Sequence, residues 1–204
     1  MFALGVATVK KAERKAEAPF AMIPLLFGVQ QIIEGMLWLS FRFDASLLNV
    51  TMTYAFTLFS HVLWPIFVPF SIGLMETVAW RKKVILAFLL IGIAVGLYLL
   101  YWIVRFPVTS GVDENIVYVS PHFYQVPVMV LYLAATCVSS FFSSHKLINI
   151  FGALALLLFM VAYWIHTVAF FSIWCFFAAI LSAVIYLHFK LGKQRAPDLM
   201  QSRA

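Results

Sequence analysis

The sequence has few charged residues and few cysteines. Only 11% of its 204 residues are Asp, Glu, Lys or Arg, whereas soluble proteins carry about 25%. The two cysteines, Cys137 and Cys175, are far apart, so the sequence contains neither a CxxC redox motif nor a zinc ribbon. These shortages exclude an ordinary soluble domain and a cysteine-based metal site.

Long apolar runs dominate the rest of the chain, which is 64% hydrophobic with a mean hydropathy of +1.00. A helix needs about 20 apolar residues to cross a bilayer, and residues 147–189, which carry no charge, are long enough for two such helices. We predict an all-α fold, a single transmembrane helix bundle over residues 1–204. Its predicted spans are 18–41, 50–76, 84–104, 124–143, 147–165 and 168–189, after a short apolar stub at residues 2–9.

The basic residues indicate how these spans are oriented. With six spans, all but two of the 14 Lys and Arg residues fall on one side of the membrane, and only Arg42 and Arg105 fall on the other. Because cytoplasmic loops are enriched in Lys and Arg, both termini and the polar tail 190–204 are predicted to be cytoplasmic. We therefore expect a multi-pass protein of the cell (plasma or inner) membrane. The net charge of +6 then reflects topology, and we expect no nucleic-acid partner.

The first predicted span contains an acid, Glu34. Gln30, Gln31 and Trp38 share its helical face. An ionisable group at membrane depth rarely faces lipid and usually marks a functional site. This face is therefore the centre of the candidate site.

His61, in the second span, is the predicted partner of Glu34. The depths of the two residues differ by about 6 Å, and the short connection makes the two helices antiparallel neighbours. Trp64 shares a polar face with His61, and Tyr98 lies near the outer end of the third span. Because these groups gather in the outer half, we expect an outward-facing pocket. The predicted site consists of Gln30, Gln31, Glu34, Trp38, His61, Trp64 and Tyr98.

Three functions fit this pattern. The first is a non-enzymatic membrane protein whose pocket binds or moves a small solute or a proton, with the lipid bilayer as its other partner. The second is a membrane-embedded lipid hydrolase that uses the same centre, with or without a metal. The third is a structural or interaction subunit, in which the polar groups only clamp helices together by hydrogen bonds. Whether the protein uses a cofactor is unknown from the sequence.

Three blocks of the chain carry a family resemblance: PLLFxxQQxxEGxxW from Pro24, HxxWPxxxP from His61 and SIWCFFAA from Ser172. They resemble a family of small bacterial polytopic membrane proteins that is known only as a domain of unknown function, and the likeness covers nearly the whole chain. Members of that family begin with an additional apolar helix that opens with Cys-Phe-Ser. The resemblance thus implies a further N-terminal helix, of which residues 2–9 are the end. It implies a fold and no activity.

A second comparison is with alkaline-ceramidase-like membrane hydrolases, which are similar only at Ser60–His61. Those enzymes hold zinc with histidines, including a His-xxx-His pair that this sequence lacks. A three-histidine site here would need His61, His166 and His122. We therefore expect no metal site.

Overall fold

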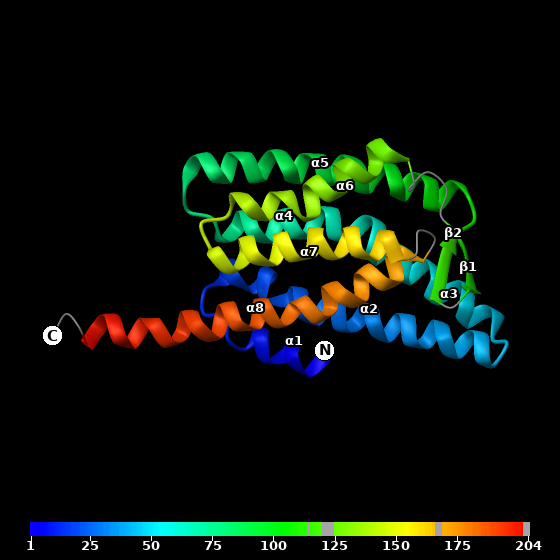
Figure 1. Cartoon of the computed structure of the whole chain (residues 1–204), viewed down its shortest axis with the longest axis horizontal. Helices are drawn as coiled ribbons and strands as arrows, with labels where there is room; N and C mark the ends of the chain where they lie inside the picture. Colours follow the sequence, from blue (N-terminus) through cyan, green and yellow to red (C-terminus); the bar gives the residue numbers. More distant parts are fainter. Residues whose placement is uncertain (114, 120–124, 166–168, 202–204) are drawn as a thin grey trace.

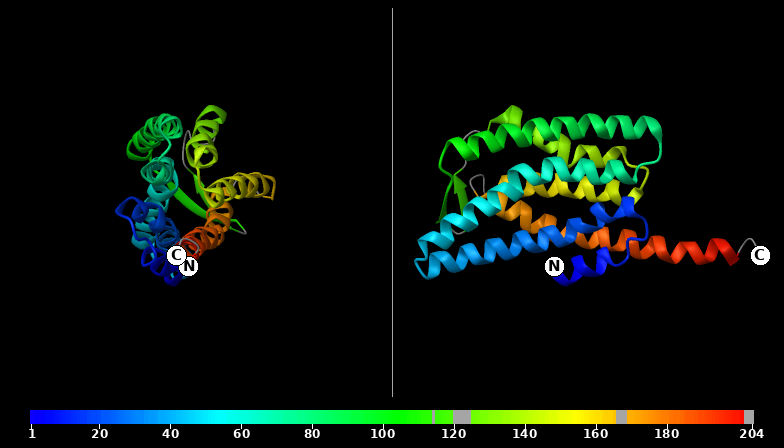
Figure 2. Two further views of the ribbon diagram at one scale, coloured as in Figure 1. Left: turned by 90° about the vertical axis from the view of Figure 1, so that its left-hand side faces the viewer. Right: turned by 180° about the vertical axis from the view of Figure 1, so that it is seen from behind.

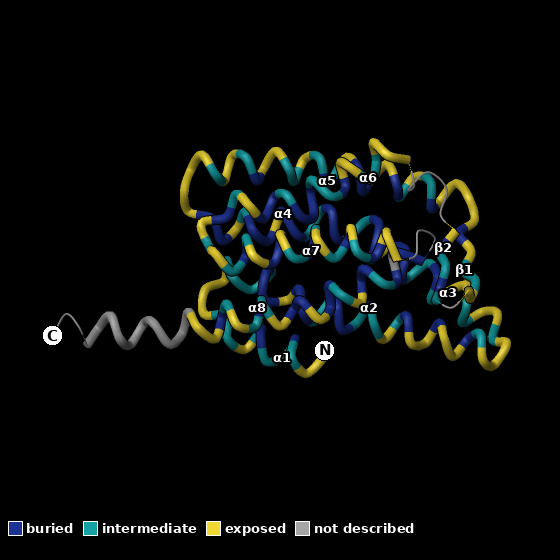
Figure 3. Tube along the Cα trace, viewed as in Figure 1, coloured by how far each residue is buried: buried dark blue, intermediate teal, exposed yellow. Residues whose placement is uncertain are grey.

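The computed structural model describes residues 1–113, 115–119, 125–165 and 169–201, and it shows long helices packed side by side along one axis (Figure 1). Viewed along that axis, the helices surround a common core (Figure 2). Their outward faces are exposed and their inward faces are buried (Figure 3). The α-helices are α1 (Phe2–Val9), α2 (Ala18–Arg42), α3 (Ser46–Thr57), α4 (Trp64–Met75), α5 (Ala79–Arg105), α6 (Val126–Thr136), α7 (Lys146–Ile165) and α8 (Phe170–Gln201).

In the part of the chain that the structure describes, five helical stretches are long and apolar enough to cross a membrane. They are Lys15–Arg42, Ser46–Met75, Ala79–Arg105, Lys146–Ile165 and Ser172–Leu191. The span predicted at 124–143 corresponds to a shorter apolar stretch, Val126–Phe142, in which α6 ends at Thr136 and a 3₁₀ turn follows over Val138–Phe142. The largely helical fold is therefore confirmed, and the lengths of these apolar helices are compatible with a membrane protein.

Two segments differ from the expectation of helices joined by loops. Strands β1 (Thr109–Asp113) and β2 (Asn115–Val119) form an antiparallel hairpin with Thr109 opposite Val119. In β2 alternate side chains are buried, and Ile116 and Tyr118 pack with Leu37, Phe56 and Cys175. This alternation of buried and exposed side chains covers only five residues, too few to indicate a strand in the sequence between the third and fourth predicted spans. At the other end of the chain, α8 continues to Gln201 through most of the predicted polar tail.

The second predicted span is irregular where its prolines begin. Between α3 and α4 the chain forms a π-helical stretch, Leu58–Leu63, in which the backbone N–H of Trp64 donates to Phe59. In this register the next carbonyl, that of Ser60, faces Pro65, which has no N–H to donate. The hydroxyl of Tyr132 from α6 donates to the Ser60 carbonyl instead. The mid-span carbonyl that Pro65 leaves without a backbone donor is thus satisfied by another helix.

Small residues set the closest helix contacts. A Cβ added at Gly92 of α5 would lie 1.8 Å from the carbonyl oxygen of Pro65, so α5 and α4 pack closely because the residue at this position is a glycine. At Gly5 of α1 an added Cβ would lie 2.4 Å from Cα of Leu25 in α2. The apolar stub is therefore a helix packed along α2, and Met1 lies beside Gly28, part of the way along the bundle (Figure 1).

Candidate functional site

The acid of α2 lies toward the hairpin end of the bundle. Glu34 is eight residues before Arg42, where α2 ends, so it is about 12 Å from that end. The basic turns before α2, α5 and α7 lie at the opposite end (Figure 1). Only 6% of the surface of Glu34 is exposed, which agrees with the expectation that it does not face lipid.

The hydrogen bonds of Glu34 connect α2 to the last helix. Ser172 of α8 donates its hydroxyl to Oε1 at 2.5 Å, and Nε2 of Gln31 donates to Oε2 at 3.4 Å. The hydroxyl of Tyr118 in β2 also lies beside the carboxyl group, and burial together with the charge of Glu34 raises the pKa of Tyr118 well above its usual value. The carboxyl group is therefore held from three directions, by α2, α8 and the hairpin.

The hydrogen-bond partners that the structure gives Glu34 include Ser172 and Gln31, and the predicted partner, His61, has a different one. His61 is buried in the π-helical stretch, where its Nδ1 lies 2.7 Å from the hydroxyl of Ser60. The short connection does make α2 and α3 neighbours. A helix has several neighbours, however, and the side of α2 that carries Glu34 faces Ser172 of α8.

A groove opens beside the carboxyl group of Glu34. It has a volume of about 510 Å³, within the range of small-molecule sites. Residues from α2, β2 and α8 line it, so it exists only where these three elements meet. The lining residues are Gln31, Glu34, Gly35, Trp38, Asn115, Ser172, Ile173, Phe176 and Phe177. Of the predicted site, Gln31, Glu34 and Trp38 are brought together here.

Gln30 and Trp64 lie one layer deeper, in the packed core. The indole N–H of Trp64 donates to Oε1 of Gln30 at 2.7 Å, and Nε2 of Gln30 donates to Sγ of Cys175 at 3.2 Å. The ring of Phe27 stacks on Trp64 with centroids 3.9 Å apart. Gln30 therefore ties α2 to both α4 and α8, which is the helix-clamping role rather than a place in the groove.

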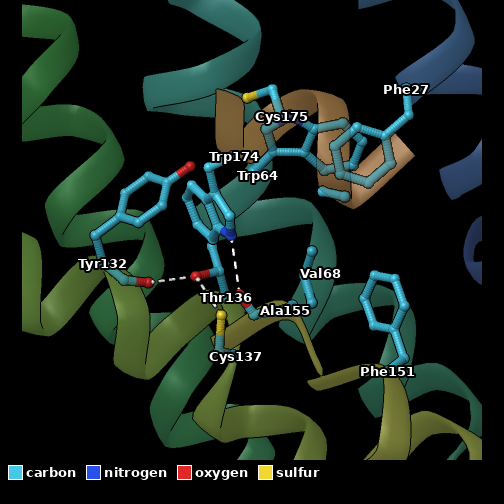
Figure 4. A pocket seen from close by; sticks show the side chains of 11 residues that line it. Phe27, Trp64, Val68, Tyr132, Thr136, Cys137, Phe151, Ala155, Trp174 and Cys175 are labelled. Carbon is cyan, nitrogen blue, oxygen red and sulfur yellow. Dashed lines mark hydrogen bonds between the residues drawn. The ribbon is translucent and has the colours of Figure 1, made fainter. Parts of the chain in front are cut away.

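A small apolar cavity lies below this clamp (Figure 4). Its volume is about 30 Å³, room for one or two waters and too little for an organic solute. Cys137 and Cys175 both line it, and Trp174 closes part of it by donating to the carbonyl of Ala155 at 2.9 Å. We assign this cavity to imperfect packing among large aromatic side chains.

The remaining predicted residues lie elsewhere. Tyr98 is on α5, at the edge of the bundle opposite α2 and α8 (Figure 1), where its ring contacts Trp102. It lines neither of these two cavities. His122 and His166, which a three-histidine zinc site would need, lie outside the described residues. Within the described part of the chain, no three His, Cys, Asp or Glu residues are grouped to hold a metal ion.

The sequence reasoning missed the part of the groove that comes from α8 and the hairpin. Ser172 and Cys175 share a helical face and were interpreted as small residues for helix packing. Asn115 was placed in a loop. Nothing in the spacing indicates which of the other helices will pack against Glu34, so only the pairing of α2 with α8 identifies these residues.

The comparisons with known proteins agree with the resemblance seen in the sequence. A family model described as a family of unknown function matches residues 1–202. No curated protein and no solved structure matches the chain significantly. The match covers nearly the whole chain and assigns no activity. The chain belongs to DUF6629, a family of unknown function.

Proposed function

We propose that this is an integral membrane protein that binds a small solute or a proton in the groove between α2, α8 and the hairpin. One observation carries the proposal: Glu34, a buried acid with only 6% of its surface exposed, lines a volume of about 510 Å³ together with the polar side chains of Gln31, Asn115 and Ser172. An acid in an apolar layer is costly. A purely structural clamp would fill the space around it.

The proposed orientation places the groove on the outer side of the membrane. The basic residues at the far end of the bundle favour the cytoplasm. Within the described residues, those at that end include Lys10, Lys11, Arg14, Lys15, Arg81, Lys82, Lys83, Lys146 and Lys190. The groove is near the other end, where the connections carry only Arg42 and Arg105. Solute would therefore reach Glu34 from outside the cell.

Thiol labelling in intact cells tests the groove. A cysteine at Gly35 would line it without a clash, because an added Cβ meets no atom within 4 Å. In a Cys137→Ala, Cys175→Ser background, a membrane-impermeant thiosulfonate should label Gly35→Cys from outside. Gly111→Cys in the hairpin should also react, whereas Leu90→Cys on the exposed face of α5 should not.

The labelling rate then reports binding. A panel of cationic, anionic and neutral small solutes is added to the purified protein in nanodiscs. A bound solute should slow the labelling of Gly35→Cys, and Glu34→Gln should abolish that protection. If Gly35→Cys is unreactive while Gly111→Cys reacts, or if no solute of any charge slows the reaction and pH has no effect on it, the proposal is overturned.

A membrane-embedded hydrolase is the second candidate, and it is favoured by the 2.5 Å contact between the Ser172 hydroxyl and Glu34. A hydroxyl that donates to a base is the arrangement of an activated nucleophile. A fluorophosphonate probe tests it: the Ser172 oxygen would bond to phosphorus, fluoride would leave, and Glu34 would take the proton. Labelling that is lost in Ser172→Ala supports this candidate, and absence of labelling overturns it.

A further inference from the structure

The groove is open along the side of the bundle, and this feature defines the class of solute. Trp38 and Phe176 are both exposed, with 42% of Trp38 and 52% of Phe176 accessible. Both lie within helical stretches long and apolar enough to cross a membrane. On the proposed function, the side opening therefore faces the bilayer, and a molecule dissolved in the lipid can enter it.

The charge of the groove favours a cation. Among the described residues of the lining, Glu34 alone has an acidic or basic side chain, and the other polar groups are neutral amides, an indole and a hydroxyl. A carboxylate in a low-dielectric layer with no basic side chain among these lining residues attracts a cation strongly. The rings of Trp38, Phe176 and Phe177 add aromatic surface, which also favours cations.

The neutral groups favour an ammonium that still has its hydrogens. The NH₂ of Gln31 already donates to Glu34, which leaves its amide oxygen as an acceptor. Asn115 brings a second amide oxygen to the lining. With the carboxylate, these oxygens supply three acceptors, which matches the three N–H donors of a primary ammonium. A trimethylammonium group would have no donor for any of them.

The wall contributed by α8 suits a hydrocarbon chain. Ile173, Phe176 and Phe177 line the groove, and their spacing places them on one face of the helix. A chain lying along this wall stays in apolar surroundings while the headgroup reaches Glu34. Partition into the bilayer would also concentrate such a molecule at the side opening.

We propose that the groove takes an amphiphilic primary amine from the outer leaflet. The ammonium lies against Glu34 and donates to the amide oxygens of Gln31 and Asn115, and the hydrocarbon chain lies along Ile173, Phe176 and Phe177 toward the lipid. This assignment rests on the proposed function and adds the ligand class and its route of entry.

Equilibrium binding of radiolabelled dodecylamine to the protein in phosphatidylcholine nanodiscs tests the assignment, with empty nanodiscs as background. Binding should saturate at one equivalent. Dodecanol, dodecanoate and dodecyltrimethylammonium should compete at least tenfold more weakly, because each lacks the charge or the donors. Butylamine should also be at least tenfold weaker, because it does not concentrate in the bilayer.

Three variants locate the binding site. Glu34→Gln should weaken dodecylamine binding at least tenfold while keeping the shape of the side chain. Gly35→Phe should weaken it similarly by filling the groove with Glu34 intact. Asp44→Asn is the matched control, because it removes an acid at the same end of the bundle outside the lining, and Asn tolerates the positive φ of that position. It should bind as the wild type does.

The outcomes separate this inference from the proposed function. If dodecanol binds as well as dodecylamine, or if Glu34→Gln binds normally, the amine assignment is overturned. If butylamine competes equally well, the hydrocarbon wall plays no part and the amphiphile assignment is overturned. If dodecylamine does not bind but another solute protects Gly35→Cys, the inference fails and the proposed function stands. If dodecylamine does not bind, no solute protects Gly35→Cys and pH does not change its labelling, the inference and the proposed function both fail.

Discussion

Two buried acids lie at opposite ends of the bundle, and their surroundings differ. Glu76, after α4, is 3% exposed. Its carboxylate accepts hydrogen bonds from the backbone N–H groups of Thr77 and Val78, and from both the N–H and the hydroxyl of Ser144. Glu34 accepts hydrogen bonds only from side chains among the described residues, those of Ser172, Gln31 and Tyr118, and it borders an open groove.

The function of Glu76 is therefore structural. Burial by itself would raise its pKa, but the hydrogen bonds from Val78, Ser144 and Thr77 outweigh burial and hold the pKa below 4.5. The carboxylate joins the turn before α5 to the turn before α7. Arg81, a basic residue near Glu76 in the sequence, donates to the carbonyl of Ser143. The number and kind of donors and the free volume nearby therefore distinguish a structural acid from a binding one.

The largest effect should come from removing the structural acid. Glu76→Ala leaves several donors without an acceptor and should lower the free energy of unfolding by about 3 kcal/mol. Glu34→Ala should lower it by about 1 kcal/mol, because fewer donors are lost and the groove is open. Reversible unfolding in mixed detergent micelles measures both. An equal loss in the two variants would show that Glu34 is also a clamp.

Two glycines, Gly92 in the packed core and Gly35 at the groove, differ in the free space around them. Gly92→Ala forces a Cβ against the Pro65 carbonyl and should cost about 2 kcal/mol of the free energy of unfolding. Gly35→Ala places its methyl group in open space and should stabilise the helix by about 0.5 kcal/mol. Thermal unfolding of both variants gives the signs. Destabilisation by Gly35→Ala would mean that the groove is closed.

The pH dependence of stability should belong to Glu76. Its folded-state pKa lies below 4.5, so its stabilising contribution is complete above the unfolded pKa and is lost as pH falls through the folded pKa. The melting temperature of the wild type should therefore fall steeply below pH 4.5. Glu76→Gln should melt lower at neutral pH and lose this part of the slope. An unchanged slope would assign the acid sensitivity to another group.

The smallest effects should come from the serines that contact the two acids. Ser144→Ala removes the 2.8 Å hydrogen bond to Glu76 and should cost about 1 kcal/mol of stability. Ser172→Ala should cost about 0.5 kcal/mol yet alter solute protection of Gly35→Cys several-fold. Unfolding and labelling rates measured on both variants test this division. A larger stability loss in Ser172→Ala would reverse it.

Several features could be predicted because they depend on local chemistry. The burial of Glu34 followed from the cost of an acid in an apolar layer. The free carbonyl near Pro65 followed from a missing N–H, and the close contact at Gly92 followed from small residues at helical spacing. Each of these depends on a few neighbouring residues, whose types are visible in the sequence.

The partner of Glu34 could not be predicted in the same way. Chain connectivity predicted that α2 and α3 are neighbours, but Ser172 lies 138 residues away from Glu34 along the chain. The stretch containing Ser172 has the same small residues whether it packs against another helix or borders a groove. The five-residue strand β2 likewise needed Leu37, Phe56 and Cys175 to bury its alternate side chains.

The sequence by itself determined that this chain forms long apolar helices, that basic residues gather at one end of the bundle, and that Glu34 is buried. These properties follow from hydrophobicity, charge and helical period. Only the tertiary structure decided that α8 and the hairpin surround Glu34 and leave a groove beside it. The reason is that helix pairing depends on the fit of whole surfaces, which residues distant in the sequence create together.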